Sequence, residues 1–344
     1  MPESLPIASF LEMAERYPVA DVRTPAEYRH GHIPGAANIP LFSDEERALV
    51  GTLYKKASPQ QAFDEGLRIT GPKMVDYVEQ ARRLARDNTL LLYCWRGGMR
   101  SGSLGWLFET AGMNIYLLKG GYKAFRRHVR EQLARPAHII VVGGMTGSGK
   151  TEILHHLREM GEQVIDLEGL AHHKGSAFGA LGQPDQPSTE HFENLLFDQW
   201  KRLDLRKPIW LEDESRSVGK VFIPEELFSQ MREAPLLDIH VDTDYRIDRL
   251  VRDYALFDPE ELIAAIRRIE KRLGGLNSRH AIEAVQRKDF RKATEILLSY
   301  YDKSYRHTMS RRNLERIIPI ELPGTDPRKH AEHLLSFARE LSLS

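Results

Sequence analysis

The stretch Ile139-Ile-Val-Val-Gly-Gly-Met-Thr-Gly-Ser-Gly-Lys-Thr151 decides the fold of the C-terminal half of the chain. Its last eight residues fit the pattern G-x-x-x-x-G-K-[ST] of a phosphate-binding loop, or P-loop. An apolar strand precedes this loop, and the amphipathic stretch Glu152 to Met160 that follows it predicts a helix. Glycines let backbone N–H groups converge on phosphate oxygens at the start of a helix, where the helix dipole favours anions. The sequence therefore predicts a polyphosphate site at Gly144, Gly147, Ser148, Gly149, Lys150 and Thr151.

Two residues of the loop have expected roles in charge neutralisation. Lys150 would neutralise a terminal phosphate, and the hydroxyl of Thr151 would hold Mg²⁺. A second metal-holding residue is expected at the end of an apolar strand, where Ile209-Trp-Leu-Glu-Asp-Glu214 offers acids. The position suits Asp213, the first candidate, or Glu214, and the sequence leaves the choice open. The motif does not distinguish ATP from another diphosphate-bearing substrate. No organic cofactor is indicated.

Short apolar strands alternate with helical segments in both halves of the chain, which indicates an α/β fold with mostly parallel sheets. The boundary is expected at Arg135-Pro136, because the residue before a proline is pushed away from helical geometry. We therefore predict two α/β domains, 1–135 and 136–344, the second of them P-loop NTPase-like and doubly wound. Residues 259–312 contain no convincing strand and are expected to form a helical insertion. The expected strands are Pro18 to Val22, Thr89 to Tyr93, Ile115 to Leu118, Ile139 to Val142, Gln163 to Asp166, Pro208 to Leu211, Leu236 to Val241 and Ile317 to Glu321.

The composition excludes several classes of protein. The 344 residues include 49 Lys and Arg against 49 Asp and Glu, so the net charge indicates no class of partner. The single cysteine excludes an internal disulfide framework and suits a reducing compartment. The N-terminal stretch lacks the pattern of a secretory signal, and no apolar run approaches about 18 residues. The sequence predicts a cytoplasmic protein without a membrane span and leaves the oligomeric state open.

The single cysteine opens the segment Cys94-Trp-Arg-Gly-Gly-Met-Arg-Ser101, which follows an apolar strand and precedes an expected helix. Backbone N–H groups at that helix start, together with Arg96 and Arg100, should lower the pKa of the thiol. The same groups would hold an anion attached to the sulfur or leaving from it. The alternative is a buried structural thiol. Two arginines and two glycines within six residues argue against it, so Cys94 is predicted to be a nucleophile, with Arg96 and Arg100 as its catalytic neighbours.

Motifs on both sides of this segment resemble rhodanese-like domains. They are Asp21-Val-Arg23, Glu27-Tyr28, Gly31-His-Ile-Pro-Gly-Ala36 and Asn38-Ile-Pro40 before it, and Leu118-Lys-Gly-Gly121 after it. In that family the cysteine begins an active loop that ends in arginine, which Cys94 to Arg100 matches. Rhodaneses carry a chalcogen on this cysteine as an S-sulfanyl or S-selanyl group, and by resemblance Cys94 would do the same.

A rhodanese-like domain fused directly to a P-loop domain is similar to the bacterial tRNA 2-selenouridine synthase family. The further matching motifs are Gly51-Thr-Leu-Tyr-Lys55, Asp166-Leu-Glu168, His173-Lys-Gly-Ser-Ala-Phe-Gly179, Gln186-Pro187, Phe192-Glu-Asn194 and Glu212-Asp-Glu-Ser-Arg216. The resemblance extends to about residue 250 and is loose beyond it. That family replaces the sulfur of wobble 2-thiouridine with selenium, first by S-geranylation from geranyl diphosphate and then by exchange with selenophosphate. The resemblance therefore implies these two co-substrates, and it implies as partners the anticodon loop of tRNA and an enzyme that supplies selenophosphate.

The implied chemistry gives each domain a task. Direct displacement of the thiocarbonyl sulfur would expel sulfide, whereas the alkylated sulfur departs as a thiolate. The P-loop and Mg²⁺ would neutralise the departing diphosphate, while Cys94 would attack selenophosphate and Arg100 would stabilise the leaving phosphate. Two alternatives stay open. One is an ATP-dependent tRNA sulfurtransferase or kinase; the other is a non-catalytic RNA-binding protein, against which the intact Cys94 loop and Lys150 argue.

A basic region in the expected helical insertion is the candidate surface for RNA. Residues 263–312 include 13 Lys and Arg against 5 Asp and Glu, with aromatic residues interleaved. Cations would neutralise phosphates, and the rings could stack on unpaired bases. On one helix the spacing i, i+1, i+4 and i+5 would form a single basic stripe from Arg287, Lys288, Arg291 and Lys292. The alternative is a solvated helical face, and the basic run Lys119 to Arg135 is a second candidate.

Overall fold

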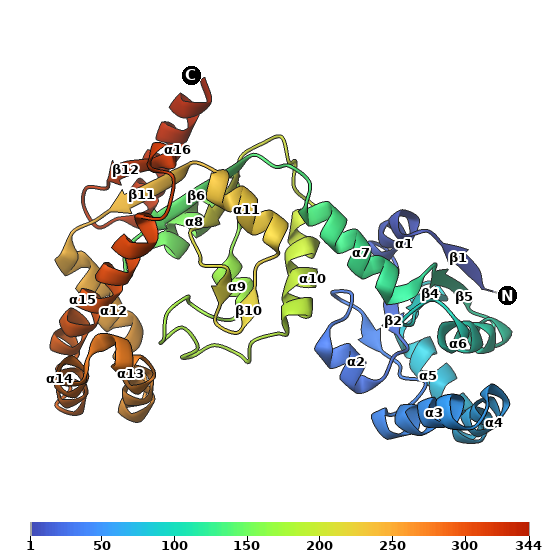
Figure 1. Cartoon of the computed structure of the whole chain (residues 1–344). Coiled ribbons are helices and arrows are strands. Elements are labelled where there is room, and N and C mark those ends of the chain that lie inside the picture. Colours follow the sequence, from blue (N-terminus) through green and yellow to red (C-terminus); the bar gives the residue numbers. More distant parts are fainter. Residues whose placement is uncertain (1, 344) are drawn as a thin grey trace. The chain divides into compact units, whose positions relative to one another are not determined.

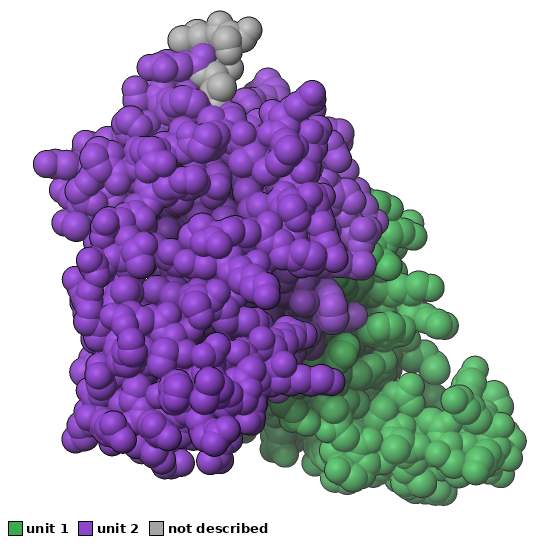
Figure 2. Space-filling model, turned by 60° about the vertical axis from the view of Figure 1, so that its left-hand side comes forward, with its two compact units in different colours: residues 1–132, 193–198 green, residues 133–192, 199–344 purple. Residues whose placement is uncertain are grey.

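The computed structural model describes residues 2–343, with side-chain burial up to residue 340. The chain divides into two compact units, residues 1–132 with 193–198 and residues 133–192 with 199–344 (Figures 1 and 2). Each unit is built on a five-stranded parallel sheet of its own. The predicted α/β fold class is confirmed. Among the described residues, no helix is both long and apolar enough to cross a membrane.

The sheet of the first unit has the strand order β1-β5-β4-β2-β3, which places β4 at its centre. All pairings are parallel, and Leu90 of β4 lies opposite Ile115 of β5. The strands are β1 (Glu3–Leu5), β2 (Val19–Asp21), β3 (Ala37–Asn38), β4 (Thr89–Tyr93) and β5 (Asn114–Leu118). The sequence predicts β2, β4 and β5, whereas β1 and β3 are too short to show an apolar pattern.

The helices of the first unit cover this sheet and add an excursion between β3 and β4. They are α1 (Ile7–Ala14), α2 (Pro25–His30), α3 (Asp44–Lys56), α4 (Pro59–Thr70), α5 (Met74–Leu84), α6 (Met99–Thr110) and α7 (Gly121–Leu133), with the 3-10 turn η1 (Gly71–Lys73) before α5. Thr24 and Ser43 start α2 and α3 with capping boxes, in which each hydroxyl accepts a backbone N–H bond. Tyr77 of α5 and Phe108 of α6 are buried in one apolar cluster with Leu90 and Leu92 of β4.

The sheet of the second unit has the order β12-β11-β6-β8-β7, with the strand before the P-loop at its centre. Its strands are β6 (Ile139–Gly144), β7 (Gln163–Ile165), β8 (Ile209–Glu212), β11 (Leu236–His240) and β12 (Ile317–Glu321). All five match predicted strands within two residues. A two-stranded antiparallel ribbon, β9 (Ser217–Val218) and β10 (Val221–Phe222), is the feature that the sequence pattern does not reveal.

Helices complete the second unit, and α13, α14 and α15 form the predicted helical insertion. They are α8 (Lys150–Glu159), α9 (Leu167–Ala171), α10 (Thr189–Trp200), α11 (Glu225–Glu233), α12 (Thr243–Tyr254), α13 (Pro259–Leu273), α14 (Gly275–Gln286), α15 (Phe290–Met309) and α16 (Pro327–Leu343), with the 3-10 turn η2 (Leu314–Arg316). Residues from α8 and α16 share an apolar cluster with β6 and β11. The insertion has a separate core, because residues of α13, α14 and α15 cluster with Phe178 and Leu181. The middle of α10, residues 193–198, groups with the first unit.

Candidate active sites

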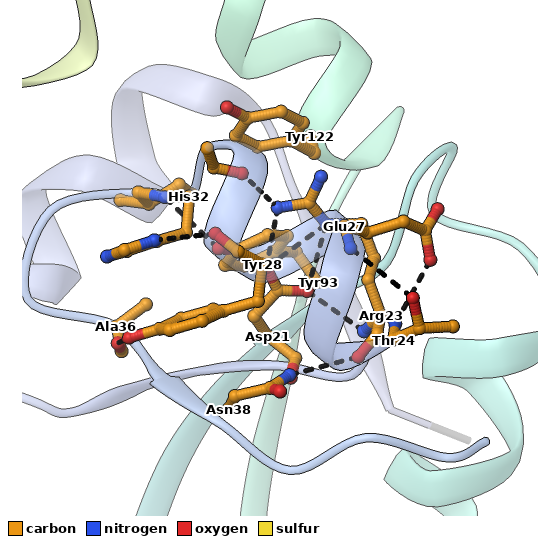
Figure 3. A network of polar contacts seen from close by, with 12 residues as sticks. Asp21, Arg23, Thr24, Glu27, Tyr28, His32, Ala36, Asn38, Tyr93 and Tyr122 are labelled. Atoms are coloured by element: carbon orange, nitrogen blue, oxygen red, sulfur yellow. Dashed lines mark hydrogen bonds and ion pairs between the residues drawn. The ribbon is translucent and has the colours of Figure 1, made fainter. Parts of the chain in front are cut away.

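A buried ion pair organises the signature motifs of the first unit (Figure 3). Arg23 donates to the carboxylate of Asp21 and to the backbone oxygen of Gly31, each over 2.6 Å. Its guanidinium lies 3.8 Å from the centre of the Tyr122 ring. Asn38 donates to the backbone oxygens of Asp21 and Arg23 at 2.8 and 2.9 Å. Loss of one charged partner would leave the other buried and unpaired, at a cost of about 3 to 5 kcal/mol. These motifs thus build the scaffold of the unit.

The sulfur of Cys94 lies just beyond the carboxyl end of the central strand β4, where the chain turns into α6. Its Sγ accepts hydrogen bonds from the N–H of Gly98 at 3.4 Å and from the hydroxyl of Ser101 at 3.2 Å. Burial opposes ionisation of the thiol, but the Ser101 hydroxyl and the N–H groups of Ser101, Gly98 and Arg96 outweigh it and lower the pKa of Cys94. The loop therefore stabilises a thiolate.

The two arginines of this loop are held differently. Arg100 donates to the carboxylate of Glu27 at 2.7 Å. Burial raises the pKa of Glu27, but Arg100 outweighs it, so the net pKa is lowered. Arg96 is exposed and forms no ion pair with any described residue. Arg96 can thus meet an incoming anion directly, whereas Arg100 is already shared with Glu27. Gly97 shapes the loop, since its φ is 66° and a Cβ there would lie 2.7 Å from the backbone oxygen of Leu118.

The P-loop joins β6 to α8, and all six predicted phosphate-binding residues lie in this one turn. Gly149 is the N-cap of α8 with a φ of 87°, a left-handed conformation that favours glycine. The ammonium of Lys150 donates to the backbone oxygen of Gly144 at 2.8 Å. Ser148 is buried, and its hydroxyl oxygen has no hydrogen-bond partner among the described residues. The helix start, the ammonium and this hydroxyl fit the oxygens of a polyphosphate.

Acidic side chains face the hydroxyl of Thr151. That hydroxyl donates to Glu168 at 3.2 Å, and the backbone N–H of Glu168 donates to Glu212 at 2.7 Å. Burial, and then the charges of Asp166 and Glu168, raise the pKa of Glu212 to about 8. No group of three His, Cys, Asp or Glu among the described residues is arranged to hold a metal. Mg²⁺ commonly needs only one or two carboxylates besides phosphate oxygens and water, so Thr151 and Glu168 fit it.

The structure turns Asp213, the predicted metal-holding acid, away from Thr151. Asp213 forms a buried ion pair with Arg312 at 2.6 Å. Side chains that follow one another along an extended chain point to opposite sides, which accounts for the difference from Glu212. Glu214 returns to the side of Glu168, where burial and the Glu168 charge raise its pKa. Glu168, which faces Thr151 and has Glu212 and Glu214 near it, is therefore a better-placed candidate for holding a metal than Asp213.

Two arginines of α12 reach the P-loop, and neither belongs to a predicted site. Arg246 donates to the backbone oxygen of Thr146 at 2.9 Å and pairs with Asp302. Arg249 pairs with Glu152, and its Nη1 lies 3.4 Å from the Cβ that Gly149 lacks. Their i, i+3 spacing puts both on one helix face. That spacing is common on surface helices, so the sequence carries no specific signal for them.

The four basic residues proposed to bind RNA do not form one helical stripe. Helix α14 ends before Arg287, and Lys288 turns the chain with a φ of 59° before α15 begins. Arg291 pairs with Asp244 and Asp248 of α12, and Lys292 pairs with a glutamate of its own helix. The predicted stripe is wrong because a left-handed turn breaks the helix and acids already neutralise Arg291. RNA binding by these residues stays a prediction.

Fold and sites together define a protein that joins a rhodanese-like unit, with a reactive cysteine loop, to a P-loop unit. Residues 7–128 match the family model of the rhodanese-like domain, and residues 137–321 match that of the tRNA 2-selenouridine synthase AAA domain. The chain is 34% identical to a tRNA 2-selenouridine synthase of Aeromonas salmonicida, over 91% of this chain and 93% of that protein. It is 32% identical to one of Nitrosomonas europaea, over 86% and 90%. The chain belongs to the tRNA 2-selenouridine synthase family.

Proposed function

We propose that this chain is an enzyme that replaces the sulfur of wobble 2-thiouridine in tRNA with selenium, through an S-geranylated intermediate made from geranyl diphosphate. The names of its relatives support an enzyme acting on tRNA. The observation that supports geranyl diphosphate as the donor is an apolar pocket beside the P-loop.

This pocket starts at Thr146 of the P-loop and extends among α12, α13, α14 and α15. Its lining is mainly aliphatic and aromatic, and no charged side chain among the described residues lines it. Lining residues from these helices include Leu250, Ile266, Val285 and Leu298. A diphosphate on the P-loop and a hydrocarbon chain along this apolar lining match the character of both surfaces, and each buried CH₂ contributes about 0.8 kcal/mol. The volume of the pocket is about 70 Å³, so the helices around it must move apart to admit a whole geranyl chain. The polar edges of adenine and ribose would find few partners there, which disfavours ATP.

In the proposed first step, the thiocarbonyl sulfur attacks C1 of the geranyl group. An S–C bond forms, the C–O bond breaks, and its electron pair leaves with the diphosphate. Lys150 would neutralise that developing charge, and Arg249 would join it on exchanging Glu152 for the diphosphate. Mg²⁺, held by Thr151 and Glu168, would supply further charge neutralisation at the diphosphate oxygens.

In the proposed second step, selenium takes the place of the alkylated sulfur at the Cys94 loop. An Se–C2 bond forms, the C2–S bond breaks and geranyl thiolate leaves with the electron pair. Selenium has the same oxidation state in selenophosphate and in selenouridine, so the overall exchange, with water releasing phosphate, is redox-neutral. Selenium in an S-selanyl Cys94 would be two electrons more oxidised than in selenophosphate, so forming this group needs a two-electron oxidant and passing selenium on to the base needs a thiol as reductant; the redox-neutral exchange needs neither. Dependence of the product on added thiol would therefore identify the S-selanyl route.

The donor assignment can be tested by filling the pocket without touching the P-loop. Ala293 of α15 is buried and lines the pocket, so Ala293→Leu should weaken geranyl-diphosphate binding and leave inorganic pyrophosphate binding unchanged. Lys150→Ala is the matched control, because it should weaken both. Overpacking can cost about 1 to 3 kcal/mol, so thermal unfolding is measured alongside. Tight ATP binding with substrate-stimulated turnover, and no affinity for geranyl diphosphate, would favour the ATP-dependent alternative.

A further inference from the structure

The sulfur of Cys94 lies at the bottom of a cleft within the first unit, between the active loop and helices α3 and α4. The cysteine side chain is only 3% exposed. The volume of the cleft is about 1390 Å³. Pockets for single small molecules are usually about 300 to 1,000 Å³, so this cleft can take more than a selenophosphate anion.

Unpaired cations surround the mouth of this cleft. Arg47, Lys55 and Lys56 of α3 and Arg96 of the loop line it, and all four are exposed. None of them forms an ion pair with a described residue. The acids in the lining are already engaged: Glu27 by Arg100, and Asp44 by the backbone N–H of Ala26 and by Arg29. The cleft is therefore electropositive, whereas Arg291 in the helical insertion is neutralised by its neighbours.

Aromatic side chains share the same walls. Tyr54 of α3, Phe63 of α4 and Trp95 of the loop are 57%, 51% and 37% exposed, although rings of this size are usually buried. Exposed rings gathered in one cleft mark an interaction surface. Rings interleaved with unpaired cations suit single-stranded RNA, in which each stacked base contributes about 1 to 3 kcal/mol.

We propose that this cleft binds the anticodon loop of tRNA, with the wobble base directed toward Cys94. Phosphates beside that base meet Arg47, Lys55 and Lys56, and unpaired bases stack on the exposed rings. The inference rests on the proposed function in one respect, namely that the substrate is tRNA modified at its wobble base. Selenium must come within bonding distance of C2 of that base, so a base modified at Cys94 has to enter this cleft.

The test uses the full chain, an anticodon stem-loop RNA with wobble 2-thiouridine, and no geranyl diphosphate. Lys55→Ala with Lys56→Ala is compared with Arg68→Ala with Arg83→Ala, which removes two exposed cations of the same unit outside the cleft. RNA affinity is measured across a salt series. If each lysine meets one phosphate, the slope of log affinity against log salt should fall by about 1.4 for the cleft variant and stay constant for the control.

A second readout localises the RNA. Cys94 is the single cysteine, so iodoacetamide alkylation reports on this cleft alone. The stem-loop should slow alkylation in the parent and in the control, and protect far less in the cleft variant. Unchanged salt slope and protection in the cleft variant would overturn the proposal. Suppose that the cleft variant binds RNA as the parent does but no longer receives selenium from a selenophosphate-supplying enzyme. The surface would then bind that protein, and the proposal would be overturned. If the stem-loop protects Cys94, but a separate incubation with geranyl diphosphate and selenophosphate gives no geranylated or selenated nucleoside, the proposed function is contradicted and this inference stands.

Discussion

Removal of the Ser101 hydroxyl should raise the pKa of Cys94, so that less of the cysteine is present as thiolate. The hydroxyl lies 3.2 Å from Sγ, and both residues are buried, so water cannot replace the lost bond. A hydrogen bond to a charged group contributes about 1.5 to 3 kcal/mol. The Ser101 hydroxyl also lies 3.3 Å from the backbone oxygen of Gly98, which shares the donor and favours the lower figure. Ser101→Ala should therefore raise the pKa of Cys94 and reduce the thiolate population about tenfold at pH values below the titration midpoint.

The alkylation rate should change less than the thiolate population. A thiolate of higher pKa is intrinsically more nucleophilic, with a Brønsted coefficient of about 0.4 to 0.5. The net expectation is an alkylation rate about threefold to fourfold lower below the titration midpoint, and a midpoint at higher pH.

The assay is the rate of iodoacetamide alkylation of the single cysteine as a function of pH. Ser103→Ala is the matched control, because Ser103 lines the same cleft on the same helix and is exposed. Its titration curve should coincide with that of the parent. If Ser101→Ala also coincides with the parent, the backbone N–H groups of residues 96, 98 and 101 alone stabilise the thiolate and the assigned role of the hydroxyl is refuted.

Two further predictions rest on the assignment of one step to each loop, and a third concerns the buried acid Glu212. Cys94→Ser should block selenium transfer and let geranylated nucleoside accumulate, seen by mass analysis of tRNA nucleosides; loss of both products in a folded variant would argue against two sites. Lys150→Ala should stop geranylation yet still permit selenation of tRNA that is supplied already geranylated, and failure on that substrate would give the P-loop a further role. Because the pKa of Glu212 is raised from 4.5 to about 8, the folded state holds an extra proton between these values. The free energy of unfolding should thus fall as pH rises through this window, and Glu212→Gln should flatten the dependence of the melting temperature on pH. A curve for Glu212→Gln that follows the parent would assign the titration to another group.

Mutation of the basic residues in the helical insertion should change RNA binding less than the number of these residues suggests. Replacing Arg287, Lys288, Arg291 and Lys292 by Ala would reduce the salt slope by roughly 3 to 4 only if each met a phosphate. Arg291 and Lys292 are engaged by acids, so a smaller change is expected. Composition over a long window counts charges, but it does not show which of them are already paired.

Much of the architecture follows from patterns that are local along the chain. The strand, glycine turn and helix of the P-loop occupy 21 consecutive residues, from Ile139 to Glu159, and all three elements form as predicted. The same holds for β4, the Cys94 loop and α6. These elements are predictable because apolar periodicity and glycine conformation act between near neighbours. The helices α3 and α4, which wall the Cys94 cleft, are not among the predicted helices; only the motif at residues 51–55, within α3, points to this part of the domain.

Which charged groups pair with one another depends on the tertiary packing. Asp213 and Glu212 are adjacent in sequence, yet one pairs with Arg312 and the other faces Glu168. Likewise Arg100 forms an ion pair with Glu27, which lies 73 residues away in the sequence. The Cys94 loop, the P-loop and the strands that carry them follow from the sequence, because they depend on residues that are near neighbours in the chain. The partners of each charge, the apolar pocket beside the P-loop and the cleft over Cys94 depend on which faces of distant helices and strands pack together, and local periodicity does not encode that choice.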